Sequence, residues 1–422
     1  MPDTPANLEY LLPLGDVGAE IGQRFTREGA LGVVVIDGSP LEEIERRYGH
    51  EAHSRALCTL AGIVKSVCDE GYGDDELVAS GEVGRSEVIL CLACDPQDAQ
   101  FYREGLPTLA RVIRERIARK GQRVAYPYMR KTPALSVGMA FVLRNPLVSA
   151  VTQLRDAIEE ARRDAALNAL LAVRYERREL LEIIVSGDLS SVYEPIVSAS
   201  DFTVFGYEAL ARGPAGSKLA TPLTLFGLAE RESLTFELDC LCRRKAIEGA
   251  AGFPDGVKLF VNIRPTAIHD PSFQPDALTA TLDRCGLSPS DVVFEISEQE
   301  SIENYEIFRE ARDAYGKLGF KFALDDTGAG YASLEAVLEL TPEFIKIDRA
   351  FVQGIDEDPA RQNMVRAFQA IAKDTNSRII GEGLSRLEEL RTLRKLGIEL
   401  GQGWLFGKPG PLLASEDDTA PS

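Results

Sequence analysis

The chain has 422 residues, of which 45% are hydrophobic and 27% charged, so a disordered, collagenous or fibrous protein is excluded. Its 66 acidic and 47 basic residues give a formal net charge of −19, which argues against nonspecific binding to polymeric nucleic acid or to anionic membranes. This length predicts two or three domains, each able to bury its own core without a disulfide or a structural metal. A cation would have to mediate the binding of an anionic substrate.

The cysteine count and the absence of targeting signals predict a cytoplasmic protein. No apolar run approaches the roughly 20 residues of a membrane span, and the first residues lack the basic segment of a signal peptide. Seven cysteines are an odd number, which favours a reducing compartment. Cys91 and Cys94 are expected to be buried thiols near a strand end, because zinc needs four ligands and no second pair follows at zinc-finger spacing. His50 and His53 would complete a metal site only if the fold happened to bring further ligands to them.

The first half of the chain alternates between strand and helix patterns. We interpret residues 1–28 as a weakly structured lead-in and residues 29–170 as an α/β domain with its connecting helix. Strands are predicted at 31–37, 86–93 and 134–142, and helices at 40–49, 52–70 and 106–120. Residues 151–186 show helical spacing without Pro or Gly, which predicts one or two helices that join the domains.

From residue 191 onward, apolar strand-like runs each end in a polar group and precede a segment with helical periodicity. The runs are VYEPIVSA, TVFGYEALAR, KLFVNI, VVFEIS, KFALDD, FIKID, RIIGEG and WLF. About eight strand-then-helix units predict a parallel sheet closed into a modified (β/α) TIM-like barrel over residues 171–413. The first two runs are joined by the short segment SDFT, whose Thr203 begins the second run, and predict an antiparallel hairpin. Residues 414–422 are polar, acidic and expected to be disordered.

Hard oxygen donors stand at the ends of these runs, where a barrel carries its active site. They are Glu208, Asn262, Glu295, Asp325, Asp326, Glu382 and Gln402, and Lys346 lies in the FIKID run. Buried carboxylates without partners would repel one another, so cations are expected among them, and oxygen ligands favour Mg²⁺ or Mn²⁺ over Zn²⁺. The number of carboxylates suggests two ions.

Two divalent ions are suited to in-line displacement at phosphorus, which predicts a phosphodiesterase or a phosphatase. Lys346 would hold the nucleophilic water or neutralise developing charge. The alternative is that each acid only caps the following helix or pairs with a base.

The second half of the chain resembles the EAL domain family, which hydrolyses cyclic di-GMP to linear pGpG on a modified (β/α) barrel. The triplet Glu208, Ala209 and Leu210 stands at the signature position and is followed by Arg212. The further blocks appear in order as FVNIRP, FEISE, LDDTGAGYASL, IKIDRAF, GEG and QGWLFGKP. The resemblance covers residues from about 178 to 410.

The resemblance implies roles for individual positions. Six residues fall on the family's metal-ligand positions: Glu208, Asn262, Glu295, Asp325, Asp326 and Glu382. Lys346 falls on the catalytic lysine, Gln402 on the active-site glutamine, and Arg212 on an arginine that contacts a substrate phosphate; Leu210 belongs to the substrate-binding signature. Glu298 matches a glutamate that anchors the loop after Asp326, which in the family supports the metal site and a homodimer interface.

Three departures from the family pattern favour a second hypothesis. Ser385 stands where the family usually has a second glutamate, Thr327 and Ala329 alter the loop after the aspartates, and Glu194 replaces a common glutamine. Loss of a group that orients ligands commonly costs about 10 to 100-fold, so weak turnover, or cyclic di-GMP binding without turnover by an effector, is the alternative to the enzyme. A scaffold without ligands is a third reading, but such a protein would have no physical use for clustered acids.

The first domain resembles a GGDEF, or diguanylate cyclase, domain that has lost its active site. Asp37 keeps a metal-binding aspartate, whereas Glu45 and Ser54 stand at the positions that read guanine. The signature carboxylate is missing at residues 84–86, so we expect no cyclase activity. The domain would then be a folded spacer or a surface for a signalling partner, or an allosteric input domain, acting in bacterial second-messenger signalling.

Overall fold

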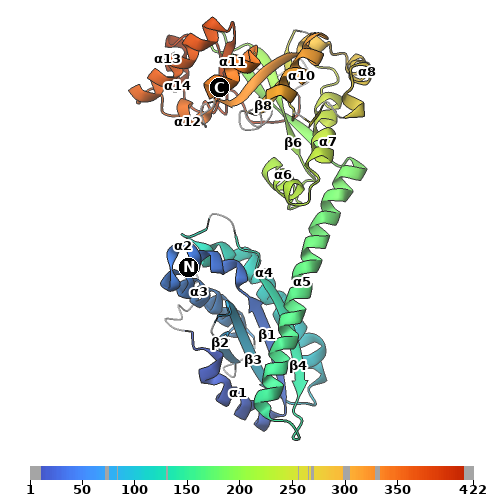
Figure 1. Ribbon diagram of the computed structural model, residues 1–422, viewed down its shortest axis with the longest axis vertical. Helices are drawn as coiled ribbons and strands as arrows, with labels where there is room; N and C mark the ends of the chain where they lie inside the picture. Colours follow the sequence, from blue (N-terminus) through green and yellow to red (C-terminus); the bar gives the residue numbers. More distant parts are fainter. Residues whose placement is uncertain are drawn as a thin grey trace. The chain divides into compact units, whose positions relative to one another are not determined.

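A computed structural model of the chain describes residues 11–71, 76–82, 84–129, 132–254, 256–264, 266–267, 270–297, 305–327 and 333–412. The chain divides into two compact units, Met1–Tyr175 and Glu176–Ser422. Helix α5 (Ala150–Ser186) runs through this division as one continuous helix of 37 residues (Figure 1). The sequence predicts one or two helices over residues 151–186, and the structure has one. None of the described helices is both long and apolar enough to cross a membrane.

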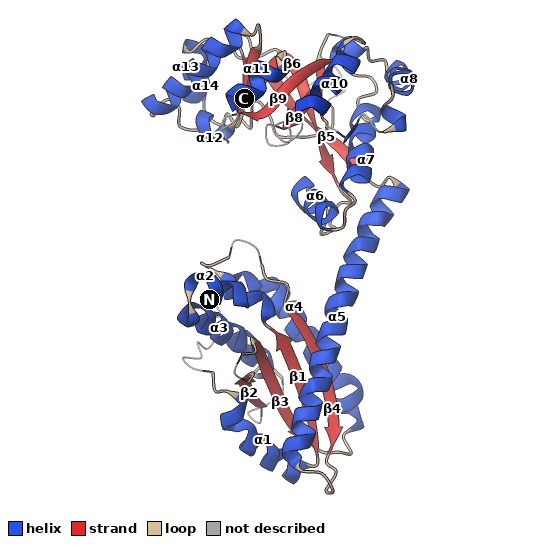
Figure 2. Cartoon of the chain, in the orientation of Figure 1, coloured by secondary structure: helices blue, strands red, loops and turns tan. Residues whose placement is uncertain are grey.

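The first unit is built on an antiparallel sheet. Its described strands lie in the order β2-β3-β1-β4, and every neighbouring pair is antiparallel (Figure 2). Its elements in chain order are α1 (Leu14–Glu28), β1 (Ala30–Asp37), η1 (Ser39–Leu41), α2 (Glu42–Tyr48), α3 (His50–Cys68), β2 (Glu76–Ser80), β3 (Glu87–Cys94), η2 (Phe101–Gly105), α4 (Leu106–Ala125), β4 (Ser136–Leu143) and the first part of α5.

Helices cover both faces of this sheet. One face packs against α1 and α5, and the other packs against α2, α3 and α4. Because both faces are buried, β1 is apolar on both sides, which explains the continuous run VVVI in place of an alternating pattern. Cys91 is buried in β3 as predicted, whereas Cys94 ends that strand and is only half-buried. All seven cysteines are free.

Two elements of the first unit differ from the sequence interpretation. Residues 14–28 were expected to be weakly structured, but they form α1, whose buried Leu14, Val17, Ile21 and Phe25 recur at helical spacing. Gly29 ends this helix in a left-handed conformation with φ 93°. Strand β2 has no counterpart in the prediction, because its short and half-buried sequence carries little apolar signal.

Gly138 on β4 marks the closest approach of α5 to the sheet. A Cβ atom at this position would overlap the backbone of Ala161 and Ala165 on α5. We expect Gly138→Ala to destabilise the first unit by roughly 1–3 kcal/mol, because the helix would have to move away from the sheet.

Gly18→Ala is the matched control. Gly18 lies inside α1 with no atom within 4 Å of a Cβ at its position, so this change should stabilise the unit by about 0.5–1 kcal/mol. Amide hydrogen exchange of the β1–β4 segments in the full chain measures both effects. Equal exchange in the two variants would contradict the close packing of α5 on β4.

The second unit contains a barrel whose described strands close in the order β10-β11-β12-β5-β6-β7-β8-β9. Strand β5 is antiparallel to both of its neighbours, and the remaining pairs are parallel. Both the barrel and the antiparallel hairpin at its start are therefore as predicted. The elements are β5 (Ser190–Ser198), β6 (Val204–Arg212), α6 (Pro222–Arg231), α7 (Thr235–Glu248), β7 (Lys258–Asn262), η4 (Pro271–Phe273), α8 (Pro275–Cys285), η5 (Pro289–Asp291), β8 (Val292–Ser297), α10 (Tyr305–Gly316), β9 (Lys321–Thr327), α11 (Ser333–Leu340), β10 (Phe344–Ile347), α12 (Arg349–Val352), α13 (Pro359–Asp374), β11 (Arg378–Gly381), α14 (Leu387–Lys395) and β12 (Leu400–Gln402).

The last strand lies earlier than its apolar run suggested. Residues 404–406, the run WLF, form a turn, and the strand is the preceding Leu400–Gln402. The strand pairs through its backbone and needs no large side chain at Gly401, where a Cβ would lie 2.5 Å from a methyl carbon of Leu384. The strongest apolar signal therefore fell outside the strand.

The floor of the barrel is a layer of apolar side chains. It consists of Ile196, Phe260, Val293, Ala323, Phe344, Ile380 and Leu400, all of them buried. Strand β6 contributes Gly206 at this level, where a Cβ would lie 2.9 Å from the ring of Phe260. The interior is therefore a packed core and not a pore.

Candidate active site

The side chain of Lys346 lies buried among four carboxylates at the carboxyl ends of the strands. Its ammonium nitrogen is 2.8 Å from Glu295 Oε1 and Glu382 Oε1, and 3.1 Å from Glu208 Oε2 and Asp325 Oδ1. Lys346 and Glu295 are almost fully inaccessible, with side chains 1% and 0% exposed. Four of the sequence-predicted acids therefore converge on one point.

The alternation of side chains along a strand explains this convergence. Apart from Glu208, which follows Gly206, each polar residue stands two positions beyond an apolar residue of the floor, so it faces the same interior one layer higher. The pairs are Phe260 with Asn262, Val293 with Glu295, Ala323 with Asp325, Phe344 with Lys346, Ile380 with Glu382, and Leu400 with Gln402. The polar layer thus rests directly on the apolar one.

A bulge between β9 and β10 places an extra backbone residue opposite Lys346. Ile345 pairs with Leu324 and Ile347 pairs with Thr327, so Lys346 stands opposite two residues, Asp325 and Asp326. Bulges of this kind recur beside active sites, where they redirect side chains. The backbone of Asp326 belongs to β9, and its side chain lies outside the described part of the structure.

Two amides complete the cluster. Gln402 donates from Nε2 to Glu208 Oε2 at 2.6 Å. Asn262 donates from Nδ2 to Glu208 Oε1 at 3.3 Å and to Glu295 Oε2 at 3.2 Å. The amide oxygen of Asn262 would have to replace its nitrogen to serve as a metal ligand, a rotation of the side-chain amide that exchanges two atoms of similar size.

The carboxylates differ in how easily they ionise. Burial raises the pKa of Glu208, but the charge of Lys346 and the hydrogen bonds from Gln402 and Lys346 outweigh burial and lower it. Burial and the negative charge of Glu208 raise the pKa of Glu295 well above its usual range. Burial, opposed by Lys346 and reinforced by Asp325, raises the pKa of Glu382 to about 8.

The cluster is short of positive charge. One ammonium faces four carboxylates, and although burial lowers the pKa of Lys346, the surrounding acids raise it well above its usual range. Oxygen atoms of Glu208, Glu295 and Asp325 lie within 4.8 Å of one another. This set of hard oxygen donors with excess negative charge fits Mg²⁺ or Mn²⁺.

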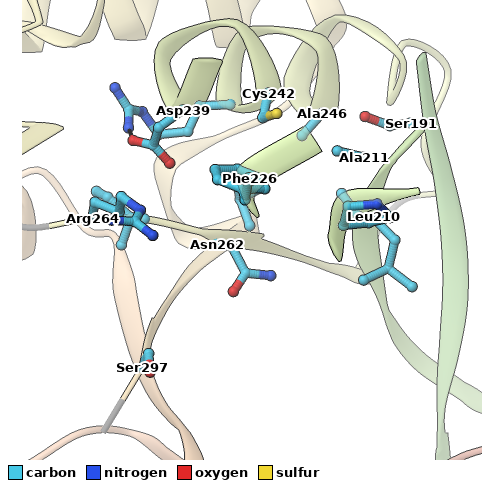
Figure 3. A pocket seen from close by; sticks show the side chains of 15 residues that line it. Ser191, Leu210, Ala211, Phe226, Asp239, Cys242, Ala246, Asn262, Arg264 and Ser297 are labelled. Carbon is cyan, nitrogen blue, oxygen red and sulfur yellow. Dashed lines mark ion pairs between the residues drawn. The ribbon is translucent and has the colours of Figure 1, made fainter. Parts of the chain in front are cut away.

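Two hollows among the described residues open beside the cluster. One, of about 350 Å³, is lined by Leu210, Phe226 and Asn262, and the guanidinium of Arg264 lies 5.7 Å from the centre of the Phe226 ring (Figure 3). The other, of about 510 Å³, contains Glu208, Glu382, Gln402, Arg349 and the exposed indole of Trp404 in its lining. The polar cluster therefore contributes residues to both hollows.

Comparison with known proteins identifies the family of this unit. The family model described as "EAL domain" matches residues 177–409, which is more than half of the chain. The chain belongs to the EAL domain family.

In two curated relatives, the region that matches this chain is only part of a longer protein. The chain is 31% identical over 191 residues to cyclic di-GMP phosphodiesterase PdeA of Borreliella burgdorferi, covering 44% of this chain and 28% of that protein. It is 32% identical over 213 residues to cyclic di-GMP phosphodiesterase PdeR of Escherichia coli, covering 50% of this chain and 32% of that protein. The chain therefore spans about a third or less of the length of these curated relatives.

A solved EAL domain shares the fold. The FimX EAL domain of Xanthomonas citri, crystallised in complex with c-diGMP, is similar to this chain with a TM-score of 0.52 and 20% identity. The likeness covers 58% of this chain and 97% of the solved one. The barrel described above is thus the EAL fold.

The remaining predicted residues of the EAL domain differ in how they are placed. Leu210 lines the smaller hollow, and Arg212 is half-buried at the end of β6, where Nη1 donates to the carbonyl of Ala211 at 2.8 Å. Glu298 and Ala329 lie outside the described residues. Thr327 is buried and donates from Oγ1 to the carbonyl of Leu324 at 3.3 Å.

Glu194 faces the larger hollow of the EAL domain, together with Glu208 and Gln402. Burial and the neighbouring charge of Glu208 raise its pKa, which reduces the extra negative charge that the sequence suggested. Ser385 lines the same hollow. Sequence reasoning missed Trp404 in the lining of this hollow, and its position two residues after Gln402 is the one signal that could have indicated it.

The first unit brings its two predicted histidines to one carboxylate. His50 Nδ1 lies 3.1 Å from Glu45 Oε1, and the mostly buried His53 places Nδ1 3.8 Å from Glu45 Oε2. Ser86 Oγ lies 3.0 Å from His53 Nε2. A hollow of about 620 Å³ is lined by these residues and by Ser54. Glu45, His50 and His53 thus offer three ligand atoms within 4.8 Å of one another, so the fold does bring a carboxylate to the two histidines.

The pKa of Glu382 predicts how pH and metal affect the stability of the EAL domain. A carboxyl with an ordinary value of 4.5 when unfolded and about 8 when folded stabilises the fold below pH 4.5 and loses this contribution as the pH rises through 8. In EDTA, the domain should therefore unfold at a lower temperature at pH 8 than at pH 6.

Divalent ions require ionised carboxylates, so Mn²⁺ should raise the unfolding temperature more at pH 8 than at pH 6. Thermal unfolding of the full chain, with and without Mn²⁺, measures this difference. Glu382→Gln is the control and should flatten the dependence on pH. A profile in EDTA that rises from pH 6 to pH 8 would contradict the assignment.

Proposed function

We propose that the EAL domain of this chain hydrolyses cyclic di-GMP to linear pGpG. The observation that carries the proposal is the buried cluster of carboxylates around Lys346, flanked by two hollows. The names of two relatives, both cyclic di-GMP phosphodiesterases, support the substrate.

The shape of the site suits a cyclic dinucleotide. Such a substrate has two bases and two phosphodiester groups, and the two hollows offer a place for a base on either side of the carboxylates. The walls formed by Phe226 and Trp404 supply aromatic faces, and stacking of a base on an aromatic side chain is worth about 1–3 kcal/mol. Leu210, Arg212 and Gln402 are the proposed substrate-binding residues.

The donor set would hold two Mg²⁺ or Mn²⁺ ions through Glu208, Asn262, Glu295, Asp325, Asp326 and Glu382. When bound, these ions supply positive charge against the phosphate oxygens and acidify the attacking water. An anionic substrate could not approach the cluster without them, because the four carboxylates exceed the single ammonium in charge.

Lys346, Glu208 and Glu298 are the proposed catalytic residues. The surrounding acids raise the pKa of Lys346, so its ammonium stays protonated and acts as a hydrogen-bond donor and a positive charge, not as a base. Such a group can orient the nucleophilic water and stabilise the charge that develops on the phosphate oxygens. Gln402 holds Glu208 in position by its hydrogen bond.

The remaining parts of the proposal follow the family resemblance. The antiparallel sheet of the first unit would be a non-catalytic GGDEF-like module for regulation or docking, because residues 84–86 provide no carboxylate. A homodimer through the EAL barrel is proposed on the same basis. A cyclic di-GMP-binding effector without turnover is the second candidate, favoured by Ser385 and by the additional carboxyl of Glu194 at the hollow.

The decisive assay measures pGpG release from cyclic di-GMP by the full chain in Mg²⁺ and in Mn²⁺. Glu208→Gln should reduce release by more than about 100-fold, because it removes a charged ligand from the centre of the cluster. Glu399→Gln is the matched control, since that side chain is 75% exposed and should leave release unchanged.

Two outcomes would contradict the enzyme. Equal release by Glu208→Gln and the unchanged chain would remove the cluster from the reaction. Binding of cyclic di-GMP without pGpG at any metal concentration would assign the protein as an effector.

A further inference from the structure

The carboxylate of Glu389 is buried beside the loop that follows β11. Glu389 lies in the first turn of α14, and only 2% of its surface is exposed. Its Oε2 accepts hydrogen bonds from the backbone N–H groups of Ser385 and Arg386, both at 3.0 Å, and from Ser385 Oγ at 3.2 Å. One oxygen thus holds the loop at two successive residues.

The second oxygen reaches a different loop. Glu389 Oε1 accepts from the backbone N–H of Gly354 at 2.9 Å, in the segment between α12 and α13. Arg386 joins the same two loops, because its Nε lies 3.4 Å from Glu389 Oε1 and its Nη2 lies 2.6 Å from Asp356 Oδ1. The carboxylate therefore ties the loop after β11 to the loop between α12 and α13, which is separated from β10 by the short helix α12.

These two loops follow the strands that carry the cluster. Glu382 comes directly after β11, and Lys346 lies on β10. The backbone N–H of Glu382 donates to the carbonyl of Ile347 at 3.1 Å, and that of Leu384 donates to the carbonyl of Gln402 at 3.0 Å.

The segment between Glu382 and Glu389 has little freedom to move. Gly383 has φ 69°, and a Cβ at this position would overlap the side chain of Arg349. A shift at residues 385–386 would therefore be passed to Glu382, because only a few tightly packed residues separate them.

Glu389 is held in its ionised form by these donors. Burial alone would raise the pKa of Glu389, but the N–H groups of Gly354, Ser385 and Arg386 and the hydroxyl of Ser385 outweigh it and lower the pKa. A buried carboxylate with this many donors is costly to replace, since each donor would lose a charged acceptor.

We propose that Glu389 is a positioning residue for the proposed metal ligand Glu382, and that its carboxylate takes the place of the second glutamate that the EAL family usually has at position 385. This inference rests on the proposed function of the EAL domain. The carboxylate reaches the loop from one helical turn further along the chain, and Ser385 is one of its donors. Although position 385 carries a serine, the loop still contacts a buried carboxylate, that of Glu389.

Metal affinity in the absence of substrate tests the proposal. Glu389→Gln keeps the shape of the side chain but places an NH₂ group against N–H donors. We expect the affinity of the full chain for Mn²⁺, measured by calorimetry, to fall about 10-fold or more, as for other groups that orient metal ligands. Amide exchange at residues 385–386 should rise in the same variant.

Two further variants separate positioning from general stability. Glu388→Gln changes the neighbouring residue, whose side chain is 54% exposed, and should leave Mn²⁺ affinity unchanged. Adding Ser385→Glu to Glu389→Gln returns a carboxylate to the loop from the exposed position 385, and should restore most of the lost affinity.

Three results would overturn the proposal. They are a change of less than twofold in Glu389→Gln, an equal loss in Glu388→Gln, and no recovery in the double variant. Because calorimetry needs no substrate, these results differ from a failure of the proposed function, which would appear as absent pGpG release by the unchanged chain that still binds Mn²⁺.

Discussion

One buried ammonium among four carboxylates is the interaction on which the second unit depends. Lys346 is the charged centre around which Glu208, Glu295, Asp325 and Glu382 are arranged. Bringing such acids together costs free energy unless their charge is compensated. The single lysine compensates part of this charge. Burial also raises the pKa of Glu295 well above its usual range and that of Glu382 to about 8, which limits the rest. The site is thus built for additional positive charge.

The two layers inside the barrel explain why the cluster could be predicted from the sequence. A strand residue and its second neighbour share a face, so an apolar run that ends in an acid predicts a buried floor with an acid above it. Phe344 with Lys346 and Val293 with Glu295 illustrate the pattern, and the parallel strands set their ends at one rim. The same logic misplaced the last strand, because Leu400–Gln402 pairs through its backbone while the apolar WLF run forms a turn.

Other features depend on contacts between distant segments and could not be read from a linear pattern. Strand β2 has only five residues and is mostly half-buried, so only its pairing with β3 defines it. The role of Glu389 is similar, since Gly354 lies 35 residues away and no motif links them. Residues whose partners lie in another loop become visible only once the fold brings the loops together.

Because of the bulge on β9, the number of aspartates at the end of this strand depends on one extra residue. Lys346 stands opposite two residues there, so removing one aspartate from the gene would restore regular pairing between β9 and β10. The neighbouring strands would keep their register, and the apolar floor would be untouched. A one-codon deletion at this bulge would therefore change which residues stand at the end of β9 while leaving the apolar floor of the barrel in place.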